Sequence, residues 1–289
     1  MTSRVWLNDE LVDASLASIN VFDHGFTVAD GVFETLKIVD GKVFALSRHL
    51  ERLQNSANIL GLGPLNIQKL EKATSEVLAA NPVINHGRMR ITISSGQGPL
   101  GSDRLDSPLT EVVAISQTDV WPQTTSIVVV PWVRNERSAI VGAKSTSYAE
   151  NVVALNAAHA AGFSEAIFTD SHGRVSEGTG TNIFIVSDSR ILTPSTDTGL
   201  LQGITRSLVI EWASERGYDV TQTHFTTADL LEADEIFITS STRDVHPVTD
   251  VGVMATDGKV VSRLTKPVGR LTLEMQNIFA HNSRLETNP

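Results

Sequence analysis

Cysteine is absent from the 289 residues of this chain. The protein therefore has no disulfide framework, no zinc site built on thiolates and no cysteine nucleophile. The first residues, 1–5, lack the apolar core of a secretory signal, and no segment is long and apolar enough to span a membrane. We therefore expect a soluble cytoplasmic protein.

Long basic runs are also absent, and the formal net charge is −10. An acidic chain repels the phosphates of nucleic acids and of anionic lipids, so neither nucleic acid nor a membrane is an expected partner. Hydrophobic residues make up 41% of the chain, enough for a sizeable core and one or two domains. Helical and strand-like patterns alternate along the sequence, which predicts an α/β or α+β architecture.

Hairpins and helices are predicted in the first third of the chain. Asn8-Asp9 and Asp40-Gly41 each separate two strand-like runs as the central pair of a hairpin turn. Ser47 is placed to cap the helix after the second hairpin, and Gly61 to end it. The elements expected next are a helix over about 67–80 and strands over 88–94 and 111–115.

A linker is expected at 119–124, where polar residues lead to Pro122. It separates a small domain, 1–118, from a larger one, 125–289. The loop at 96–108 in the small domain is rich in glycine and proline. Long loops of this kind inside compact domains are often lids or binding loops.

Several cations of the small domain are candidates for a site. Arg48, His49 and Arg52 lie in the first turns of the first long helix, where a solvated helix face is the simpler interpretation. In the alternative, Arg52 points into a cleft and holds an anion. Alternation puts Arg88 and Arg90 on the same face of their strand, which faces either solvent or a site.

Lys144 lies ahead of a predicted helix in the larger domain, after a buried strand at 126–130. Ser147 and Glu150 fit a capping box, so the helix is expected to run from about Ser147 to Gly162. The positive end of the helix dipole and any burial would favour a neutral amine at this place. A neutral amine is what Schiff-base chemistry requires. Taken alone, Lys144 is more simply a surface residue of a loop.

Glu177 changes that interpretation. The run at 165–170 and the run after it form a second strong hairpin, with Glu177 and Asn182 at the end of its second arm. Gly178-x-Gly180 lacks the third glycine of a dinucleotide-binding loop and does not open a helix, so we exclude a Rossmann fold. An amine and an acid on one short unit, Lys144 and Glu177, indicate a carbonyl cofactor with a basic ring nitrogen.

Two later segments are suited to anions. The turn at 203–206 leads directly into a helix, and backbone N–H groups at a helix start bind phosphate well. The strand at 235–238 ends in four hydroxyl residues, 239–242, for which an ordinary polar loop is an equally simple interpretation. Arg243 beside them offers a bidentate clamp for a carboxylate or phosphate.

Together these segments resemble the class IV, or fold type IV, pyridoxal-phosphate enzymes. That group includes branched-chain aminotransferases, D-amino acid transaminases and aminodeoxychorismate lyases. The matching pieces, in the expected order, are Asp30–Glu34, His49–Arg52, Lys144 with its helix, Ser176–Phe184, Gly203–Arg206 and Thr239–Pro247. The resemblance implies a small N-terminal α/β domain, a larger C-terminal α/β pseudo-barrel domain that binds the cofactor, and a homodimer.

The resemblance also implies roles for the cofactor residues. Lys144 would form the Schiff base with pyridoxal 5'-phosphate and shuttle the Cα proton of the substrate. Glu177 would pair with the pyridine nitrogen and keep the ring protonated, so that the ring can accept carbanion charge. Tyr148 falls near a tyrosine that donates to the cofactor's phenolic oxygen in branched-chain enzymes. The residues expected to hold the phosphate are Arg52, Ile204, Thr205, Ser241 and Thr242.

Four positions are implied to choose the substrate. Phe33 stands where D-amino acid enzymes have a tyrosine, and Ser95 where those enzymes and the lyase have an arginine that clamps a carboxylate. Arg90 falls near the arginine with which branched-chain enzymes hold the side-chain carboxylate of glutamate. Arg243 falls where they have a small residue. Our hypothesis is that Arg243 or Arg90 compensates for the arginine missing at Ser95.

The first functional expectation is a transaminase that moves an amino group between an amino acid or (R)-amine and a 2-oxo acid. The alternative is a 4-amino-4-deoxychorismate lyase, which releases pyruvate and 4-aminobenzoate and uses the same lysine. The missing arginine at Ser95 favours the transaminase. A third hypothesis, a non-catalytic phosphate-binding protein, would leave Lys144 and Glu177 without a shared purpose. Metal ligands are not expected, because no ligand spacing relates the histidines, most of which we expect in loops or at the surface: His24, His49, His159, His172, His224 and His246.

Overall fold

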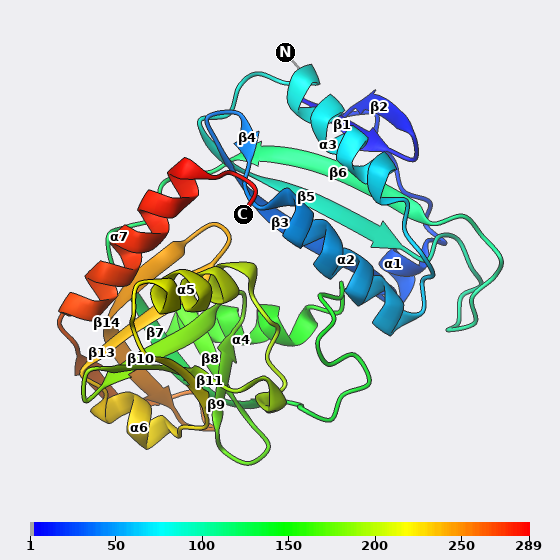
Figure 1. The fold of residues 1–289 in the computed structure, drawn as a ribbon. Coiled ribbons are helices and arrows are strands. Elements are labelled where there is room, and N and C mark those ends of the chain that lie inside the picture. Colours follow the sequence, from blue (N-terminus) through cyan, green and yellow to red (C-terminus); the bar gives the residue numbers. More distant parts are fainter. Residues whose placement is uncertain (1–2) are drawn as a thin grey trace. The chain divides into compact units, whose positions relative to one another are not determined.

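The structure is a computed structural model that describes residues 3–289, and the chain packs into two compact units (Figure 1). The first unit contains the chain as far as Val120 together with 143–147 and 287–289. The second contains 121–142 and 148–286. The chain thus passes from the first unit to the second inside the predicted linker. The short segment that carries Lys144 belongs to the first unit, whereas the sequence analysis placed it in the larger domain.

A six-stranded antiparallel sheet is the frame of the first unit. Its strands, in spatial order, are β2 (Glu10–Asp13), β1 (Arg4–Leu7), β6 (Thr110–Gln117), β5 (His86–Ser94), β3 (Gly31–Val39) and β4 (Lys42–Val43). The helices of this unit are α1 (His24–Thr27), α2 (Leu46–Leu60) and α3 (Ile67–Ala80). Helices α2 and α3 lie on one face of the sheet (Figure 1), and the apolar residues of β3 and β5 pack against them there.

The predicted hairpin turns and the second long helix of this unit are confirmed. Asn8 and Asp9 have φ of 46° and 75°, and Asp40 and Gly41 have φ of 48° and 72°. Positive φ at both central residues is what a type I′ turn requires. Helix α3 has the predicted limits, although β4 ends at Val43, earlier than the strand-like pattern.

The start of helix α2 differs from its prediction. Ser47 does not cap this helix, which begins at Leu46, after Ala45 in the left-handed region (φ 55°). The C-terminal end of the chain supplies the acceptors instead, because Ala45 N–H donates to Thr287 O and Ser47 N–H to Asn288 Oδ1. A partner about 240 positions away cannot be read from a local capping pattern.

The second unit is built on a nine-stranded sheet. Its strands, in spatial order, are β12 (Val220–Thr223), β11 (Arg190–Pro194), β10 (Asn182–Ser187), β13 (Glu235–Ser240), β14 (Asp244–Met254), β7 (Thr125–Arg134), β8 (Glu165–Asp170) and β9 (Val175–Gly178), with β15 (Val260–Thr265) beside β14. The helical segments are α4 (Ala149–Ala160), η1 (Thr196–Thr198), α5 (Ile204–Glu215), α6 (Thr227–Glu232) and α7 (Arg270–Leu285).

The two ends of this sheet come together. At the β9 end, Arg174 forms a β-bridge with Thr226, and Val175 N–H donates to Phe225 O at 2.8 Å. Phe225 and Thr226 follow β12, the strand at the other end of the sheet, after the single residue His224. The sheet therefore curls back on itself, which confirms the predicted α/β fold with a pseudo-barrel.

Helix α4 ends as predicted but does not begin as predicted. Its end is marked by Gly162, with φ 80°. The capping box predicted at Ser147 is wrong, because α4 follows Tyr148, whose side chain makes no capping bond. Ser147 Oγ instead donates to Ala29 O, a residue of the first unit, at 3.3 Å.

Two strands are longer than the predicted runs at 111–115 and 235–238. Strand β6 includes Ser116 and Gln117, and β13 includes Thr239 and Ser240. Each of these polar residues is paired with a neighbouring strand, and a sheet ladder overrides local polarity. Among residues 3–289, no helix is long and apolar enough to cross a membrane.

The segment 144–146 lies antiparallel to residues 31–33 at the edge of β3. Its backbone bonds are Phe33 N–H to Lys144 O at 2.9 Å and Thr146 N–H to Gly31 O at 2.8 Å. Glycine is required at position 31, because a Cβ there would lie 2.7 Å from Ile93 O and 3.2 Å from Thr146 Oγ1. The glycine therefore allows the lysine segment to approach the sheet.

We expect Gly31→Ala to destabilise the protein by about 1–3 kcal/mol, because the added methyl group has no space and displaces a backbone carbonyl or the lysine segment. Urea unfolding followed by circular dichroism measures the change. Gly101→Ala is the matched control, since a Cβ at Gly101 meets nothing within 4 Å and its φ is not positive. Equal stability of the two variants would contradict this account of the edge.

Candidate active site

Lys144 is held through its backbone by two elements of the first unit. Its N–H donates to the buried Ser56 Oγ of α2 at 3.0 Å, and its carbonyl accepts from Phe33. The side chain then extends over the Phe33 ring, with Nζ 4.5 Å from the ring centroid. The predicted position just ahead of a helix is thus only approximate, because four residues separate Lys144 from α4 and a sheet edge holds it.

Arg90 meets the same aromatic ring. Its Cζ lies 3.7 Å from the Phe33 centroid, and its Nε donates to Thr92 Oγ1 at 3.1 Å. Alternation along β5 leaves Arg88 and Arg90 exposed and buries Met89, so the predicted shared face of the two arginines is confirmed. The first unit therefore brings Lys144, Phe33 and Arg90 together.

A buried ionic network lies on the opposite face of β3. Glu34 is fully buried, and its carboxylate accepts from Arg52 Nε and Nη2 and from His49 Nδ1, each at 2.7 Å. The expectation of a solvated helix face is therefore wrong for His49, which is 1% exposed, and for Arg52, whose side chain is 14% exposed. Glu34 accepts through two of the five N–H donors of the guanidinium, one on Nε and one on Nη2, and so orients Arg52.

The charges of this network follow from its burial. Burial alone would raise the pKa of Glu34, but the adjacent Arg52 and His49 lower that pKa well below its ordinary value of 4.5. Burial lowers the pKa of His49 below 6.5, against the opposing effect of Glu34. At neutral pH the carboxylate is therefore ionised and His49 is a neutral donor. The buried position of Glu34 could have been predicted from the alternation along β3. Glu34 shares a face with the apolar Val32 and Leu36, and a buried acid needs a partner there.

Ser95 and the loop at 96–108 form another part of the first unit. Ser95 is buried, and its N–H donates to Asp30 O at 3.1 Å. Arg104 returns from the loop to Asp30, with Nε 2.6 Å from Oδ2, and also donates to Gly61 O. Burial alone would raise the pKa of Asp30, but Arg104 holds it below 3.8. The loop is therefore tied to the segment just before β3, and its role as a lid stays a prediction.

Glu177 lies in β9 of the second unit and is also buried. Its Oε2 accepts from Leu201 N–H at 3.0 Å, and its Oε1 lies 3.2 Å from Arg134 Nε. Arg134, at the end of β7, was missed by the sequence analysis. The strand-like run was expected to end near Val130, and no local pattern relates Arg134 to Glu177.

Helix α5 begins at Ile204, where the turn at 203–206 was predicted to lead into a helix, and its role in binding an anion stays a prediction. Gly203 precedes the helix, no side chain caps it, and Ile204 and Thr205 are buried in its first turn. Burial lowers the pKa of the neighbouring Arg206 to about 10, against the effect of Glu177, so Arg206 is a cation at neutral pH. Its guanidinium donates to Pro194 O and to two other acceptors, which fixes the helix start.

Ser241 and Thr242 lie with Arg243 in the turn between β13 and β14, partly exposed. The Arg243 guanidinium is directed elsewhere, since its Cζ lies 3.8 Å from the Trp121 ring centroid and Nη1 donates to Thr125 Oγ1 at 3.2 Å. Burial lowers the pKa of Arg243, although Glu165 opposes the shift. Arg243 therefore packs the start of β7, which leaves Arg90 as the better candidate for a substrate carboxylate.

The histidines divide between buried and exposed positions. His24, His49 and His246 are buried, contrary to the expectation that most histidines lie in loops or at the surface. Within residues 3–289, no group of histidine, aspartate and glutamate side chains is arranged to hold a metal.

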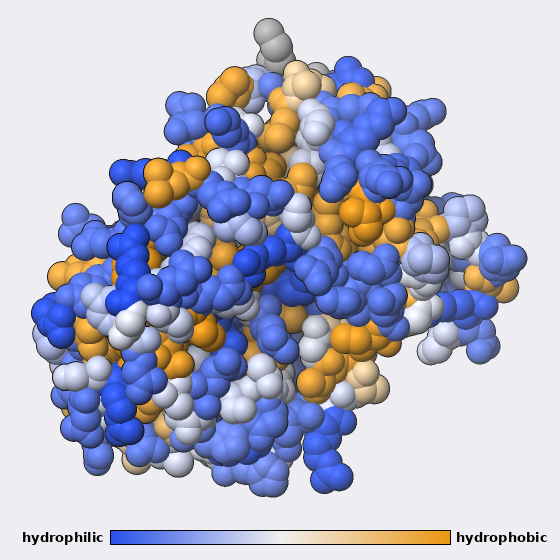
Figure 2. Space-filling view, in the orientation of Figure 1, coloured by the Kyte–Doolittle hydropathy of each residue, from blue (hydrophilic) through white to orange (hydrophobic). Residues whose placement is uncertain are grey.

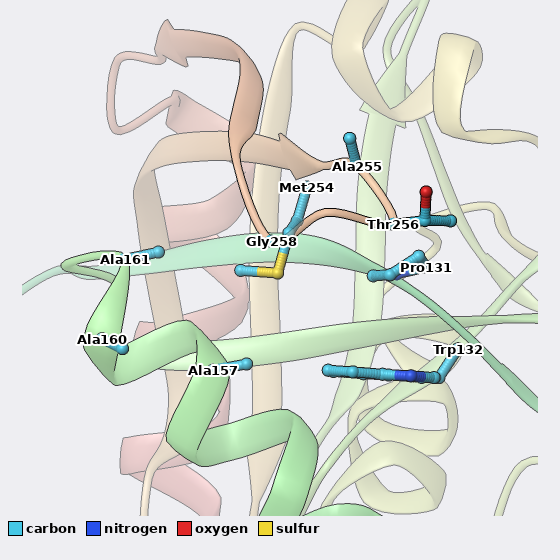
Figure 3. A pocket seen from close by; sticks show the side chains of 9 residues that line it. All are labelled: Pro131, Trp132, Ala157, Ala160, Ala161, Met254, Ala255, Thr256 and Gly258. Carbon is cyan, nitrogen blue, oxygen red and sulfur yellow. The ribbon is translucent and has the colours of Figure 1, made fainter.

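A pocket of about 250 Å³ in the second unit is lined by residues without titratable side chains: Pro131, Trp132, Ala157, Ala160, Ala161, Met254, Ala255, Thr256 and Gly258. Figure 3 shows the Trp132 ring extending toward Ala157, with Met254 entering from the other side. Its lining offers shape and apolar contact but no acid, base or nucleophile.

The donor set fits pyridoxal 5'-phosphate. The cofactor needs an amine for its carbonyl carbon, an acid for its ring nitrogen and N–H groups for its phosphate. Lys144, Glu177 and the uncapped start of α5 at Ile204 and Thr205 are groups of these three kinds. Tyr148, the residue predicted for the phenolic oxygen, stands at the start of α4.

Comparison with known proteins shows the family. The family described as amino-transferase class IV matches residues 31–251. The chain is 34% identical to a protein of Methanocaldococcus jannaschii named "Putative branched-chain-amino-acid aminotransferase", over 96% of this chain and 95% of that protein. It is 31% identical to the D-alanine aminotransferase of Listeria innocua, over 96% and 94%. The solved branched-chain aminotransferase of Thermoproteus uzoniensis has a TM-score of 0.89 at 29% identity, with 97% of this chain and 94% of that chain covered.

The chain therefore belongs to the class IV aminotransferases. It is a pyridoxal-phosphate-dependent enzyme that transfers amino groups, as the sequence predicted. The expected fold type IV is likewise confirmed.

We expect Glu34→Gln to destabilise the protein at pH 7 by about 3 kcal/mol, because it leaves Arg52 without its buried counterion. A depressed folded pKa means that the stability Glu34 contributes is present above its ordinary pKa of 4.5 and is lost as the pH falls below that value. The difference in unfolding free energy between wild type and the Glu34→Gln variant should therefore become smaller in acid. Urea unfolding from pH 7 to pH 3 measures it, with the exposed Glu51→Gln as control. A difference that stays constant from pH 7 to pH 3 would contradict the assignment of an ionised carboxylate to Glu34.

Proposed function

We propose that this aminotransferase passes amino groups between an α-amino acid and a 2-oxo acid that carries a second carboxylate, and that Arg90 binds that second carboxylate. One observation supports the proposal above others. The Phe33 ring is contacted by both the Lys144 amine, at 4.5 Å, and the Arg90 guanidinium, at 3.7 Å. A substrate whose reacting carbon lies at the Lys144 amine therefore has a second cation, Arg90, in contact with the same aromatic ring.

Phe33 gives this arrangement its chemistry. It is 4% exposed and presents an apolar ring that both cations contact, so the surface beside the reacting amine is apolar. An apolar ring offers no hydrogen bond to a substrate carboxylate, whereas a guanidinium binds one with two parallel N–H groups. We therefore assign the distal carboxylate to Arg90 and the van der Waals contact to Phe33.

The cofactor supplies a carbonyl carbon that captures the amino group and a ring that accepts the electrons of the broken Cα–H bond. In the proposed assignment Lys144 would hold the cofactor through Nζ, and the same Nζ would take up and return the Cα proton. Glu177 would hold the proton on the ring nitrogen. Tyr148 would donate to the phenolic oxygen. The phosphate is assigned to the Ile204 and Thr205 N–H groups and to Arg52, Ser241 and Thr242.

A donor screen tests the function itself. The purified protein is given D-alanine, L-leucine, an (R)-amine or aminodeoxychorismate separately, and the spectrum of the bound cofactor and the release of 4-aminobenzoate are recorded. We expect conversion to the pyridoxamine form with an α-amino acid, and its reversal by a dicarboxylic 2-oxo acid. Release of 4-aminobenzoate without any pyridoxamine form would overturn the proposal in favour of the lyase.

We also propose that the enzyme is a cytoplasmic homodimer. Apolar side chains gather on the surface of the first unit between residues 14 and 28, where Leu16, Val21 and Phe26 are 78%, 67% and 76% exposed. Figure 2 shows hydrophobic groups among the hydrophilic side chains of the face in view. Exposed apolar side chains that lie together mark interfaces. Light scattering should give twice the chain mass of 31.2 kDa, and the mass of a single chain would contradict the dimer.

Arg90→Gln should raise the KM for dicarboxylic substrates about 10- to 100-fold, since a hydrogen bond to a charged group contributes about 1.5–3 kcal/mol. The KM for a monocarboxylic amino acid should stay the same. Arg88→Gln is the matched control, because Arg88 is exposed on the same face of β5. Steady-state kinetics with dicarboxylic and with monocarboxylic substrates measures the two KM values. An equal change in both KM values would contradict the proposed role of Arg90.

A further inference from the structure

Arg134 is a half-buried cation to which the proposed reaction assigns no part. Its side chain is 17% exposed, and its guanidinium lies over the Phe168 ring, with Cζ 4.4 Å from the ring centroid. Nε is 3.2 Å from Glu177 Oε1, and Nη1 donates to Asn151 Oδ1 at 3.2 Å. Three contacts thus hold one cation against the acid assigned to the cofactor's ring nitrogen.

The contact between Arg134 and Glu177 is mainly a charge interaction. Nε is within ion-pair distance of the carboxylate but lacks the alignment of a hydrogen bond. The other carboxylate oxygen is held by Leu201 N–H. One carboxylate oxygen therefore accepts from a backbone N–H and the other lies beside the positive charge of Arg134. The carboxylate has one preferred orientation as a result. A carboxylate with 11% exposure is also costly unless a cation balances it.

Arg134 also reaches the turn after Glu177. Asn151, which accepts from Arg134, donates through Nδ2 to Thr179 O. Thr179 in turn donates its N–H and Oγ1 to the buried Glu165. These contacts open a competing explanation, in which Arg134 supports only the shape of the turn.

We infer that Arg134 is a positioning residue for Glu177, whose positive charge balances and orients this buried carboxylate and then shares it with the cofactor ring. The inference rests on the proposed pairing of Glu177 with the ring nitrogen. Two cations that share one carboxylate each weaken the other's hold on it. Arg134 therefore sets how strongly Glu177 binds the protonated ring.

A double-mutant cycle on the full chain without cofactor separates charge from shape. Arg134→Gln should lower the Tm by about 5 °C or more when Glu177 is present, because it strips a buried acid of its cation. The same change in a Glu177→Gln background should lower the Tm by about 1 °C or less, since no charge is left to balance. Arg137→Gln, an exposed arginine of the same segment, is the matched control and should leave the Tm unchanged.

Equal losses in both backgrounds would overturn the inference and assign Arg134 to the turn alone. If Arg134→Gln does not fold, the double variant decides. Recovery of folding when Glu177 is also neutral supports the charge interaction, and failure to fold in both backgrounds contradicts it. Arg134→Lys, which keeps the charge, should restore most of the lost Tm.

Addition of pyridoxal phosphate tests whether Arg134 and the cofactor ring share the Glu177 carboxylate. The rise in Tm on adding the cofactor should be larger for Arg134→Gln than for wild type, because the protonated ring then replaces the missing cation. An equal or smaller rise in Tm for Arg134→Gln would contradict a carboxylate shared between Arg134 and the ring. Failure of the proposed function has a different signature: Glu177→Gln would then leave cofactor affinity and the visible spectrum unchanged, while the cofactor-free cycle would still report on Arg134.

Discussion

The backbone hydrogen bonds between residues 144–146 and 31–33 are the constraint on which the candidate site of the first unit depends. They attach a lysine that follows the second unit's first strand in sequence to the sheet of the first unit. Because the lysine backbone is bonded to Phe33 and to Ser56, its side chain leaves the sheet over the Phe33 ring. The separation of the Lys144 amine from Arg90 is then set by one rigid antiparallel sheet. A site built on strands in this way holds its geometry better than one built on loops.

Buried charge is the second organising feature. Glu34 is balanced by Arg52, and Glu177 by Arg134 together with a backbone N–H. Glu165 is surrounded by hydroxyl and N–H donors of the turn that follows Glu177. An ionised group in a protein interior is tolerated only with such partners, and these partners also fix its direction. The orientation of these three buried acids is therefore set by contacts within the protein itself.

Local features of the fold were predictable from the sequence. The two hairpin turns follow from Asn8-Asp9 and Asp40-Gly41, whose residue types tolerate positive φ, and helix α3 follows from its apolar spacing. The caps expected at Ser47 and Ser147 were wrong because the groups that satisfy those segments come from Asn288 and Ala29, far away in the chain. Local patterns describe only local partners.

The candidate site shows the same division. Lys144, Glu177 and the start of α5 could be named because each lies in a motif with its own chemical logic. Arg134 and Ser56 could not, since only the folded chain brings them to Glu177 and Lys144. Arg243 was named for its position after a run of hydroxyls, yet its guanidinium stacks on Trp121, a contact that no spacing rule reveals.

The central claim is that Lys144 is the residue that carries the cofactor. Borohydride reduction of the purified protein, followed by proteolysis and mass spectrometry, tests it most directly, with Lys144→Ala as the control that cannot be labelled. The account predicts a phosphopyridoxyl group on the peptide that contains Lys144 and on no other. A label on a different lysine, such as the buried Lys37, or no label in a protein that binds the cofactor, would contradict it.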